Sequence, residues 1–240
     1  MFSLVVPFHS DVEKLSGTLA LLRESATAHG IREILLCHNG SVLDPATRSA
    51  IEARTWEGVR LLSTPTKGIG AGYKLGIGAA REEFLVLSAS DLPFGFSDVE
   101  AFRDYAREHG RPPDVAIGSK AHPRSRLSAS YGLRRRLASR AFWLLRALVL
   151  GRETPKDSQG TILVRTQIAR ALLPELAFDN YLFSLELVTL AQRRGHPVVE
   201  LPIEISHHEG GASSVSLLRD GTRMAIDLVQ LSRRLREGDP

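Results

Sequence analysis

Short apolar runs and segments of helical periodicity alternate along the first half of this chain. The predicted strands, each a short apolar run closed by polar or turn-forming residues, are 3–7, 31–37, 59–63 and 84–89. The predicted helices between them are 14–29, 45–54 and 70–81. Strands that alternate with helices in this way predict an α/β fold, with a mostly parallel central sheet flanked by helices on both faces.

The second half of the chain continues with longer helices. The predicted elements are a helix at 98–109, a strand at 114–119, a basic and apolar helix at 130–150, a strand at 161–165, a helix at 181–194, a strand at 198–205 and an amphipathic helix at 216–236. No internal repeat or linker interrupts the sequence. We therefore expect a single domain over residues 1–240.

Composition and charge exclude several classes of protein. The 240 residues hold 31 Lys and Arg against 27 Asp and Glu, a formal net charge of +4, and 43% are hydrophobic, as in an ordinary folded domain. Only 6% are aromatic, and no aromatic residues are interleaved with Lys and Arg, so nucleic-acid binding is not expected. The single cysteine, Cys37, forms neither an internal disulfide nor a Cys-rich zinc site, which favours a reducing, cytoplasmic setting.

No segment has the pattern of a signal peptide or a membrane span. The apolar run at residues 2–7 follows no basic region. The most apolar later stretch, 141–150, is interrupted by Arg146 and is shorter than the roughly 20 residues that a spanning helix needs. We expect a cytoplasmic protein. If the basic helix at 130–150 binds lipid, the protein is attached peripherally to the inner face of the membrane.

The segments after the predicted strands carry the candidate chemistry, because ligands of parallel α/β sheets bind outside the carboxyl ends of the strands. In chain order these segments are PFHSDVEKL (7–15), HNGS (38–41), KGIGAGYKLGIGAA (67–80) and SASDLP (88–93). None of them has the Gly-x-x-x-x-Gly-Lys-Ser/Thr or Gly-x-Gly-x-x-Gly spacing. A P-loop or a dinucleotide-binding Rossmann fold is therefore excluded.

The order of these motifs resembles the family 2 glycosyltransferases of the GT-A fold, in particular the branch that makes dolichyl- or polyprenyl-phosphate sugars. That branch carries Pro-x-x-Asn-Glu, Asp-Asp/Asn-Gly-Ser, Lys-Gly-x-Gly-x-Ala and Asp-x-Asp-Leu after its first four strands. Downstream, the segments that match the branch are GSKAHPRSR, RRRLASRAFWLLRALVLG, KDSQGTILVR and FSLELVTLAQRRGHPVVELPIEI. The resemblance covers about residues 2 to 230 of the chain.

Several acidic positions of the family pattern are replaced. Ala89 stands at the first acid of Asp-x-Asp, which leaves Asp91, and His38 stands at the first acid of the second motif. Ser184 replaces the Asp of Phe-Asp-x-Glu-Leu, and Thr161 and Ile162 replace Phe-Lys. Two interpretations stay open: a diverged or inactive member, or an active enzyme adapted to another donor or less dependent on metal. Asp91 by itself also fits a turn residue.

The resemblance implies a nucleotide-sugar-binding half over residues 1–119 and an acceptor-binding half over 120–240 that ends in the amphipathic helix. The implied donor-binding residues are Pro7, His9, Asp11, His38, Asn39, Lys67 and Asp91. The implied catalytic residues are Asp91, Asp157 and Gln159. The implied acceptor-binding residues are Lys120, Arg126, Arg136, Ser139 and Arg140. Asp91 is the implied ligand of Mg²⁺ or Mn²⁺, which one or two carboxylates and substrate phosphates can hold.

The basic helix at 130–150 supports two interpretations. Arg136 and Arg140 lie at i and i+4 on one face, and the apolar positions Leu137, Ala141, Leu144 and Leu148 form another. With Trp143, this helix can lie at a membrane interface and hold a lipid phosphate. Alternatively, it is a solvated basic face over an apolar stripe that packs in the core.

Two polar features lie further along the chain. Glu186 sits in an otherwise apolar helix, so we expect a buried carboxylate that needs a partner. His207 and His208 precede a loop rich in glycine and serine that we expect to close over the donor phosphates. A zinc site at the two histidines lacks spaced partner ligands.

The resemblance implies an inverting glycosyltransferase that moves a sugar from a nucleoside diphosphate sugar to an acceptor, with a polyprenyl phosphate as the preferred assignment. The expected partners are this nucleotide sugar, a lipid phosphate and a membrane surface, and no nucleic acid. Two alternatives remain: a soluble glycosyltransferase for a small or secondary-metabolite acceptor, and a catalytically silent nucleotide-sugar-binding protein.

Overall fold

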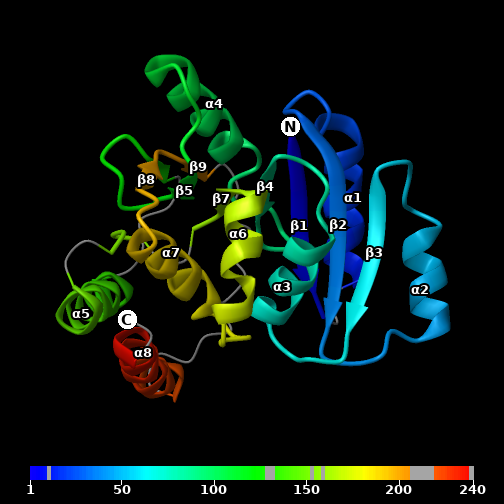
Figure 1. Ribbon diagram of the computed structural model, residues 1–240. Helices are drawn as coiled ribbons and strands as arrows, with labels where there is room; N and C mark the ends of the chain where they lie inside the picture. The colour runs from blue at the N-terminus through cyan, green and yellow to red at the C-terminus, as the bar shows by residue number, and fades with distance from the viewer. Residues whose placement is uncertain (10–11, 128–132, 152–153, 158–159, 206–218, 238–240) are drawn as a thin grey trace.

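The computed structural model describes residues 1–9, 12–127, 133–151, 154–157, 160–205 and 219–237 (Figure 1). The strands are β1 (Phe2–Phe8), β2 (Ile31–Asn39), β3 (Val59–Thr64), β4 (Phe84–Leu87), β5 (Val115–Gly118), β6 (Arg126–Leu127), β7 (Ile162–Arg165), β8 (Val198–Leu201) and β9 (Glu204–Ile205). The helices are α1 (Val12–Ser25), α2 (Pro45–Glu52), α3 (Ile69–Ala79), α4 (Ser97–His109), α5 (Leu133–Leu150), α6 (Thr166–Leu172), α7 (Phe183–Arg193) and α8 (Arg219–Glu237), with a 3₁₀ turn, η1 (Leu173–Glu175).

Seven of the described strands form one sheet in the order β3-β2-β1-β4-β7-β5-β8. The pairs β1–β2, β1–β4, β2–β3 and β5–β8 are parallel, and β7 runs antiparallel to both β4 and β5. Because β7 is reversed, the segment that precedes it lies at the same edge as the carboxyl ends of its neighbours. The predicted α/β fold with a mostly parallel sheet is confirmed.

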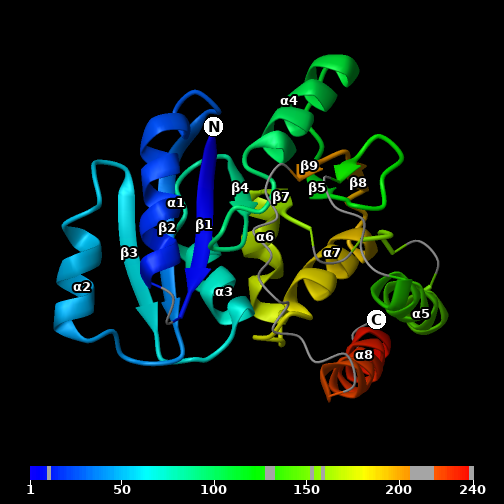
Figure 2. The ribbon, with the colours of Figure 1, turned by 180° about the vertical axis from the view of Figure 1, so that it is seen from behind.

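Helices cover both faces of the sheet, and alternate residues of each strand enter different cores. Val5 of β1 belongs to the core formed with α3, α6 and α7, which lie in front of the sheet in Figure 1. Its neighbours Leu4 and Val6 pack with α1, α2 and α4, and α1 is in front in the opposite view of Figure 2. Both faces of the sheet at β1 are therefore buried, as the continuous apolar sequence of this strand predicts.

The glycine-rich sequence of α3 allows this helix to lie directly on β1. A Cβ at Gly76 would be 2.2 Å from a methyl group of Val5, and a Cβ at Gly72 would be 2.8 Å from Pro7. Such separations are shorter than van der Waals contact, so only glycine permits the observed approach of helix and strand. This packing brings the start of α3 close to the end of β1.

Helices α5 and α8 lie side by side at one end of the molecule in both views (Figures 1 and 2). The Ser232 hydroxyl donates a 3.1 Å hydrogen bond to the Val149 carbonyl between them. Leu228, Leu231 and Leu235 of α8 are buried, as the amphipathic pattern predicts. Within the described part of the chain, no helix combines the length and the apolar composition required to cross a bilayer.

The structure corrects three expectations. Residues 198–205 are not one strand, because Pro202, which has no amide hydrogen, separates β8 from β9. The short helix α6 is absent from the predicted elements. Leu144 and Leu148 of α5 are 53% and 83% exposed, so this part of the helix's apolar stripe does not pack in the core.

Candidate active site

The carboxyl ends of the parallel strands bring the predicted donor residues to one edge of the sheet. Phe8 of β1 lies opposite His38 of β2, and Asn39 lies opposite Thr64 at the end of β3. His9 and Lys67 follow immediately after β1 and shortly after β3. The sheet topology therefore gathers side chains that are far apart in the sequence.

Asn39 connects three of the segments at this edge. Its side-chain amide donates to the Phe8 carbonyl at 3.0 Å, and its Oδ1 accepts from the Gly68 amide at 3.1 Å. The residue is 5% exposed, so these bonds form away from water. Asn39 therefore fixes the end of β1 relative to the start of α3, and its position determines where Lys67 lies.

Two histidines stack beside Asn39. The rings of His9 and His38 are 5.9 Å apart between centroids with an interplanar angle of 22°. His9 Nδ1 donates to the Asn39 carbonyl at 2.5 Å, while His38 Nδ1 lies 3.4 Å from Ser63 Oγ. His9 is exposed and His38 is buried. Burial lowers the pKa of the His38 imidazole below its ordinary value of 6.5, so the ring is neutral at neutral pH.

The segment that carries Lys67 is shaped by close backbone contacts. Gly68 has φ of 127°, and a Cβ there would lie 2.0 Å from the Asp179 carbonyl oxygen. The Gly70 amide donates to the same oxygen at 2.8 Å, and Lys74 Nζ lies 2.8 Å from Asp179 Oδ1. Lys67 itself is exposed. The backbone next to Lys67 is thus fixed at the edge of the sheet and tolerates only glycine at residue 68.

Lys67 and His9 approach the same point of the second loop. A Cβ at Gly40 would lie 3.2 Å from Lys67 Cγ and 3.1 Å from the His9 ring. One exposed cation and one exposed imidazole therefore flank this glycine. The lysine ammonium supplies hydrogen-bond donors for an anionic group, and the histidine adds a donor at Nε2 when its ring is protonated, because its Nδ1 already donates to Asn39.

The predicted burial of Glu186 is confirmed, and its partners are backbone amides. Both of its carboxylate oxygens accept from the Ala177 amide at 3.0 Å, and Oε2 also accepts from the Phe178 amide at 3.0 Å. Burial raises the pKa of Glu186, although these hydrogen bonds favour the charged form. Glu186 thus holds the loop that presents Asp179 to α3.

Asp91 is exposed in the turn after β4. The next residue, Leu92, has φ of 42°, which is uncommon outside glycine, and its side chain is buried. Burial raises the pKa of the Tyr73 hydroxyl, and the charge of Asp91 adds to this effect, so Asp91 lies near Tyr73 at the carboxyl edge. The buried Leu92 side chain thus attaches this turn to the core, and the Asp91 side chain next to it faces solvent.

A metal ion at this edge would have few protein ligands. Among the residues that the structure describes, no three His, Cys, Asp or Glu side chains group together as a metal site. Asp91 is the predicted site residue that the structure describes here with a hard oxygen ligand of the kind that Mg²⁺ and Mn²⁺ prefer. One carboxylate can hold a metal ion whose remaining ligands are substrate phosphates and water. It cannot hold a metal ion that needs all of its ligands from the protein.

On the acceptor side, the structure joins Lys120 to Asp157. The Lys120 amide donates to Asp157 Oδ2 at 3.0 Å, and its Nζ lies 3.8 Å from the same oxygen. The Asp157 side chain is 11% exposed and that of Lys120 is 28% exposed. Lys120 Nζ also lies 5.9 Å from the centre of the Phe94 ring. This pair sits where the chain leaves β5 and before it enters β7.

The other predicted site residues divide into two groups. Arg126 on β6 and Arg140 on α5 are exposed, and Pro7 is buried under α3. The remaining ones lie outside the described residues or have side chains there: Asp11, Arg136, Ser139 and Gln159, with His207 and His208 of the predicted closing loop. Their roles stay predictions.

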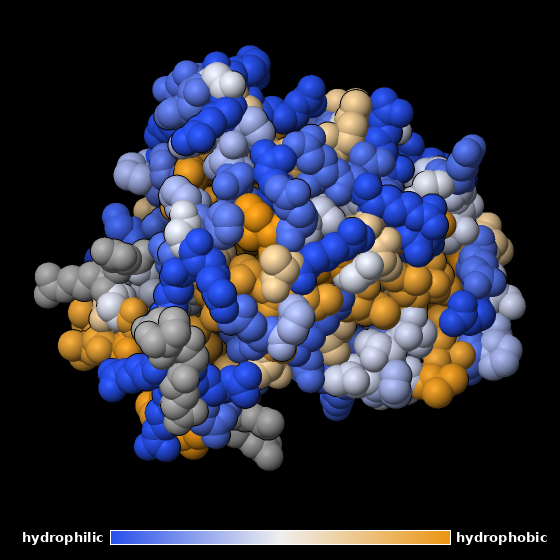
Figure 3. All heavy atoms as spheres, in the orientation of Figure 1, coloured by the Kyte–Doolittle hydropathy of each residue, from blue (hydrophilic) through white to orange (hydrophobic). Residues whose placement is uncertain are grey.

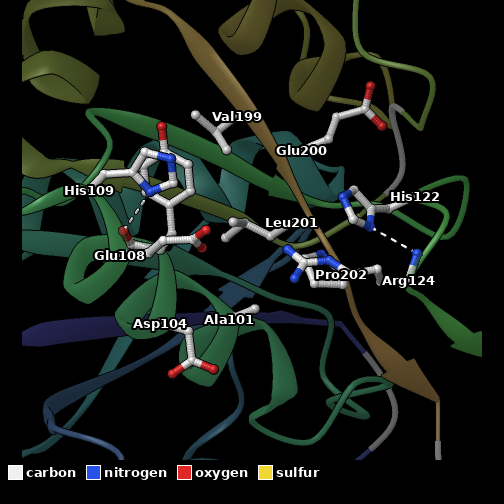
Figure 4. Close-up of a pocket in the computed structure, with 11 residues that line it drawn as sticks. Ala101, Asp104, Glu108, His109, His122, Arg124, Val199, Glu200, Leu201 and Pro202 are labelled. Carbon is white, nitrogen blue, oxygen red and sulfur yellow. Dashed lines mark hydrogen bonds between the residues drawn. The ribbon is translucent and has the colours of Figure 1, made fainter.

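Two other features are separate from this edge. Burial raises the pKa of Cys37 to about 12, so its thiol is no nucleophile at neutral pH. A cavity of about 280 Å³ lies between α4, β8 and the segment that contains His122 (Figure 4). None of the predicted donor or acceptor residues lines it. We therefore place the candidate active site at the carboxyl edge and not in this cavity.

Sequence analysis missed the tertiary partners of four residues: Lys74 and Asp179, which form an ion pair, and Arg146 and Glu200, which both bond to the loop that precedes β7. Only Arg146 left a signal in the sequence, as a charge inside an apolar stretch. The others resemble ordinary surface residues until the fold shows their partners.

No family model matches the chain. The dolichyl-phosphate β-glucosyltransferase of Trichomonas vaginalis is 26% identical over 249 residues, which cover 98% of this chain and 72% of that protein. The enzyme of the same name from Saccharomyces cerevisiae is 26% identical over 249 residues, with 95% of this chain and 72% of that protein covered. These matches confirm the resemblance to family 2 glycosyltransferases that the motif order predicts.

Solved structures confirm the GT-A fold. Glucosyl-3-phosphoglycerate synthase from Mycobacterium tuberculosis, in complex with UDP, matches with a TM-score of 0.63 at 16% identity, over 98% of this chain and 79% of that chain. A mannosyltransferase from Pyrobaculum calidifontis, in complex with GDP-mannose and Mn²⁺, matches with a TM-score of 0.61 at 14% identity, over 99% of this chain and 65% of that chain. At these identities the likeness is one of fold.

Proposed function

We propose that this protein transfers a glucosyl group from a nucleoside diphosphate glucose to a polyprenyl phosphate. The observation that carries the proposal is the match, over 84–98% of this chain, to four proteins that are all named dolichyl-phosphate β-glucosyltransferases. In the reaction, an oxygen of the acceptor phosphate bonds to the anomeric carbon while the bond from that carbon to the diphosphate oxygen breaks. The configuration inverts, as the resemblance implies.

The donor side supplies positive charge for the leaving group. The bond that breaks leaves an additional negative charge on the nucleoside diphosphate, and stabilising this charge is the main requirement of the step. Lys67 is an exposed cation and directly precedes Gly68, whose amide donates to Asn39. We assign Lys67 to the diphosphate, and His9 and His38 to the nucleoside part of the donor. We also assign Pro7, and Asp11 outside the described residues, to the donor side, as the resemblance implies.

Asp91 is assigned to a divalent ion, Mg²⁺ or Mn²⁺. Its exposed carboxylate would hold the ion together with the two phosphates of the donor, and the bound ion would supply further charge neutralisation for the leaving group. The Mn²⁺ complex of the Pyrobaculum mannosyltransferase, which shares the fold, supports this assignment.

The acceptor side needs cations more than a strong base. A phosphate monoester has a second pKa of about 6, so its oxygen is largely ionised at neutral pH and is already nucleophilic. Lys120 offers a partly exposed ammonium group beside Asp157. We assign Lys120, with the exposed Arg126 and Arg140, to the acceptor phosphate. Asp157 orients Lys120 through two contacts to one carboxylate oxygen.

Helix α5 carries a surface that suits a membrane interface. Arg140, Leu144 and Leu148 follow one another at i+4 spacing, and all three are exposed. Figure 3 shows hydrophobic side chains at the surface in the region of α5 and α8. Exposed leucines in line with an arginine combine apolar contact with attraction to anionic headgroups. We propose peripheral attachment through this helix, with Arg136 and Ser139 adding to the acceptor site.

The experiment is a transfer assay with the purified full chain. Glucose-labelled nucleoside diphosphate donors that differ in the base are incubated with dolichyl phosphate, and label in the organic phase is counted. Unphosphorylated dolichol is the matched control, because it lacks the proposed nucleophile. The expected result is labelled lipid with one donor and only with the phosphorylated acceptor.

Other outcomes contradict the proposal in distinct ways. Release of nucleoside diphosphate with label confined to a small phosphorylated acceptor would indicate a soluble glycosyltransferase. Thermal stabilisation by a donor without turnover on any acceptor would indicate a silent binding protein.

A further inference from the structure

The inward face of α5 carries a buried cation. Arg146 is 1% exposed and is among the largest fully buried side chains, although the same helix exposes Leu144 and Leu148. Burial of a charged group is costly unless charges and hydrogen bonds compensate it. The neighbours of Arg146 therefore indicate what the charge is used for.

Arg146 holds the loop that carries Asp157. Its guanidinium donates to the Pro155 carbonyl and, at 3.2 Å, to the Lys156 carbonyl. The Nε atom has no hydrogen-bond partner among the described residues. Burial lowers the pKa of Arg146, and the negative charges of Asp157 and Glu200 oppose that shift. The guanidinium thus lies close enough to both carboxylates for their charges to act on it.

Glu200 holds the same loop from the other side. Its Oε1 accepts from the Lys156 amide at 2.9 Å, and its Oε2 accepts from the Ser119 hydroxyl at 2.6 Å. In Figure 4, Leu201 points toward the cavity and Glu200 points away from it, as alternation along a strand requires. Glu200 therefore reaches across the end of β5 to the loop.

These contacts determine where the Asp157 carboxylate lies. The carbonyls of residues 155 and 156 are fixed by Arg146, the amide of residue 156 by Glu200, and the carboxylate of Asp157 by Lys120. Four separate parts of the chain converge here: α5, the end of β5, the loop before β7, and β8. A loop restrained at both its carbonyl and amide groups has little freedom to move its side chain.

We propose that Arg146 is a positioning residue that fixes Asp157 and Lys120 at the reacting centre from behind. Its guanidinium is directed at the backbone of the loop and not at the surface, because it is 1% exposed and donates to the Pro155 and Lys156 carbonyls. It acts by holding the loop backbone and by balancing the charges of Asp157 and Glu200. This inference rests on the proposed function, which places Asp157 and Lys120 at the acceptor.

The first test separates catalysis from donor binding. Arg146→Gln removes the charge, and Arg146→Lys keeps it with fewer hydrogen bonds. Because a displacement of about 1 Å can cost roughly 100-fold in rate, we expect kcat to fall by about 10- to 100-fold in Arg146→Gln and less in Arg146→Lys. The KM for the donor should stay within about two-fold, because the donor residues lie on other loops.

The pH dependence of kcat gives a further readout. Loss of a positive charge on the acceptor side favours the protonated form of an acidic group there, so the acid limb of the pH–rate profile should move to higher pH in Arg146→Gln, and Arg146→Lys should leave it in place. A merely structural defect would lower the rate without moving this limb. An unmoved limb in Arg146→Gln would contradict the proposed balance of charge.

A double-mutant cycle tests whether Arg146 acts through Asp157. If it does, adding Arg146→Gln to Asp157→Asn should lower kcat by less than about two-fold further, because the group being positioned is already lost. Multiplicative losses would overturn the proposal. Arg60→Gln is the matched control: Arg60 also donates to a carboxylate and a carbonyl, those of Glu33 and Ala79, at the opposite edge of the sheet, and its loss should leave kcat unchanged.

Hydrogen exchange decides the point without turnover. The amides of Lys120 and Lys156 are bonded to Asp157 and Glu200, so both should exchange faster in the Arg146 variants and at the wild-type rate in Arg60→Gln. Unchanged exchange in Arg146→Lys and Arg146→Gln would overturn the positioning role, even if the wild type transfers no sugar. Absence of transfer by the wild type would instead contradict the proposed function. If Arg146→Gln does not fold, the comparison is made with Arg146→Lys.

Discussion

Asp98, at the first turn of α4, gives the sharpest test of the electrostatics of this fold. Its side chain is 2% exposed and accepts from the Val99 amide at 2.7 Å and from the Thr161 hydroxyl. Burial raises the pKa of this carboxyl from an ordinary 3.8 to about 6. Asparagine has nearly the same shape and can keep both hydrogen bonds without a charge. We therefore predict that Asp98→Asn stabilises the protein at neutral pH.

The expected gain in stability follows from the shift in the pKa of Asp98. A rise from 3.8 to about 6 corresponds to about 3 kcal/mol, at about 1.36 kcal/mol for each pH unit. The N-terminal dipole of α4 favours the carboxylate by about 0.3 to 1 kcal/mol and reduces the gain. We expect a net gain of about 2 kcal/mol in the free energy of unfolding, or about 4 to 8 °C in Tm for a domain of this size.

The pH dependence has a definite sign. Because the folded state binds the proton more tightly than the unfolded chain, the wild type loses stability as the pH rises from about 4 to about 6, and the loss is constant above that range. Asp98→Asn lacks this titration. The difference between the two proteins should therefore be close to zero near pH 4 and reach its full value above pH 7.

Urea unfolding at pH 4.5, 6 and 8, followed by tryptophan fluorescence, measures this difference. Asp104→Asn on the same helix is the control, because the Asp104 side chain is 64% exposed and its loss should change stability by less than about 0.5 kcal/mol at every pH. A gain in Asp98→Asn that is equal at pH 4.5 and pH 8 would contradict the electrostatic origin. A loss of stability at pH 8 would refute the reasoning outright.

Four other predictions follow from the site and the packing. Asp91→Asn should abolish the effect of Mg²⁺ on donor binding, measured by calorimetry with and without the ion, and unchanged metal dependence would contradict the assignment. Replacing Arg136 and Arg140 with Ala should lower the affinity for anionic liposomes, measured by sedimentation, by about 30-fold, at about 1 kcal/mol for each arginine, and leave donor affinity unchanged. Equal sedimentation of variant and wild type would contradict the assignment of α5 to the membrane interface. Donor affinity should change with pH through His38, with a midpoint below the ordinary imidazole pKa of 6.5 because burial lowers this pKa, and His38→Asp should abolish the dependence; two superimposable profiles would show that the imidazole does not contact the donor. Gly76→Ala places a methyl group 2.2 Å from a valine of β1 and should cost about 1 to 3 kcal/mol in urea unfolding, whereas alanine at the exposed glycine two residues later should be tolerated.

The pattern of apolar and polar residues predicted most of the helices and strands. Residues on the buried face of a helix or strand are apolar, so they recur along the sequence with the period of that element. The apolar runs at β1 and β2 and the leucine spacing of α1 and α8 predict these elements to within a few residues. The short helix α6 has too few residues to display two helical turns of pattern, so nothing distinguishes it from a loop. Pro202 marks the break between β8 and β9 in the sequence. A proline interrupts a strand only where its missing amide hydrogen would have bonded to a neighbouring strand, and the sequence does not show which strand lies there.

The residue types of the candidate site were also evident from the sequence, and so was their place after the strands. His9, His38, Asn39 and Lys67 lie at the carboxyl edge for a topological reason: parallel strands end at the same side of a sheet. The sequence also indicates that Glu186 is buried. It does not indicate that its partners are two backbone amides of a preceding loop.

Which groups meet was decided only by the tertiary structure. Lys120 and Asp157 are 37 residues apart, and Lys156 and Glu200 are 44 apart, yet each pair is in hydrogen-bond contact. Hydrogen bonds and desolvation act over a few ångströms in space, and a chain sets these distances only after its strands have been ordered and its helices packed. The sequence therefore determined the fold class and the strand ends that carry the chemistry, and the tertiary placement of α5 determined that Arg146 bonds to the loop that carries Asp157.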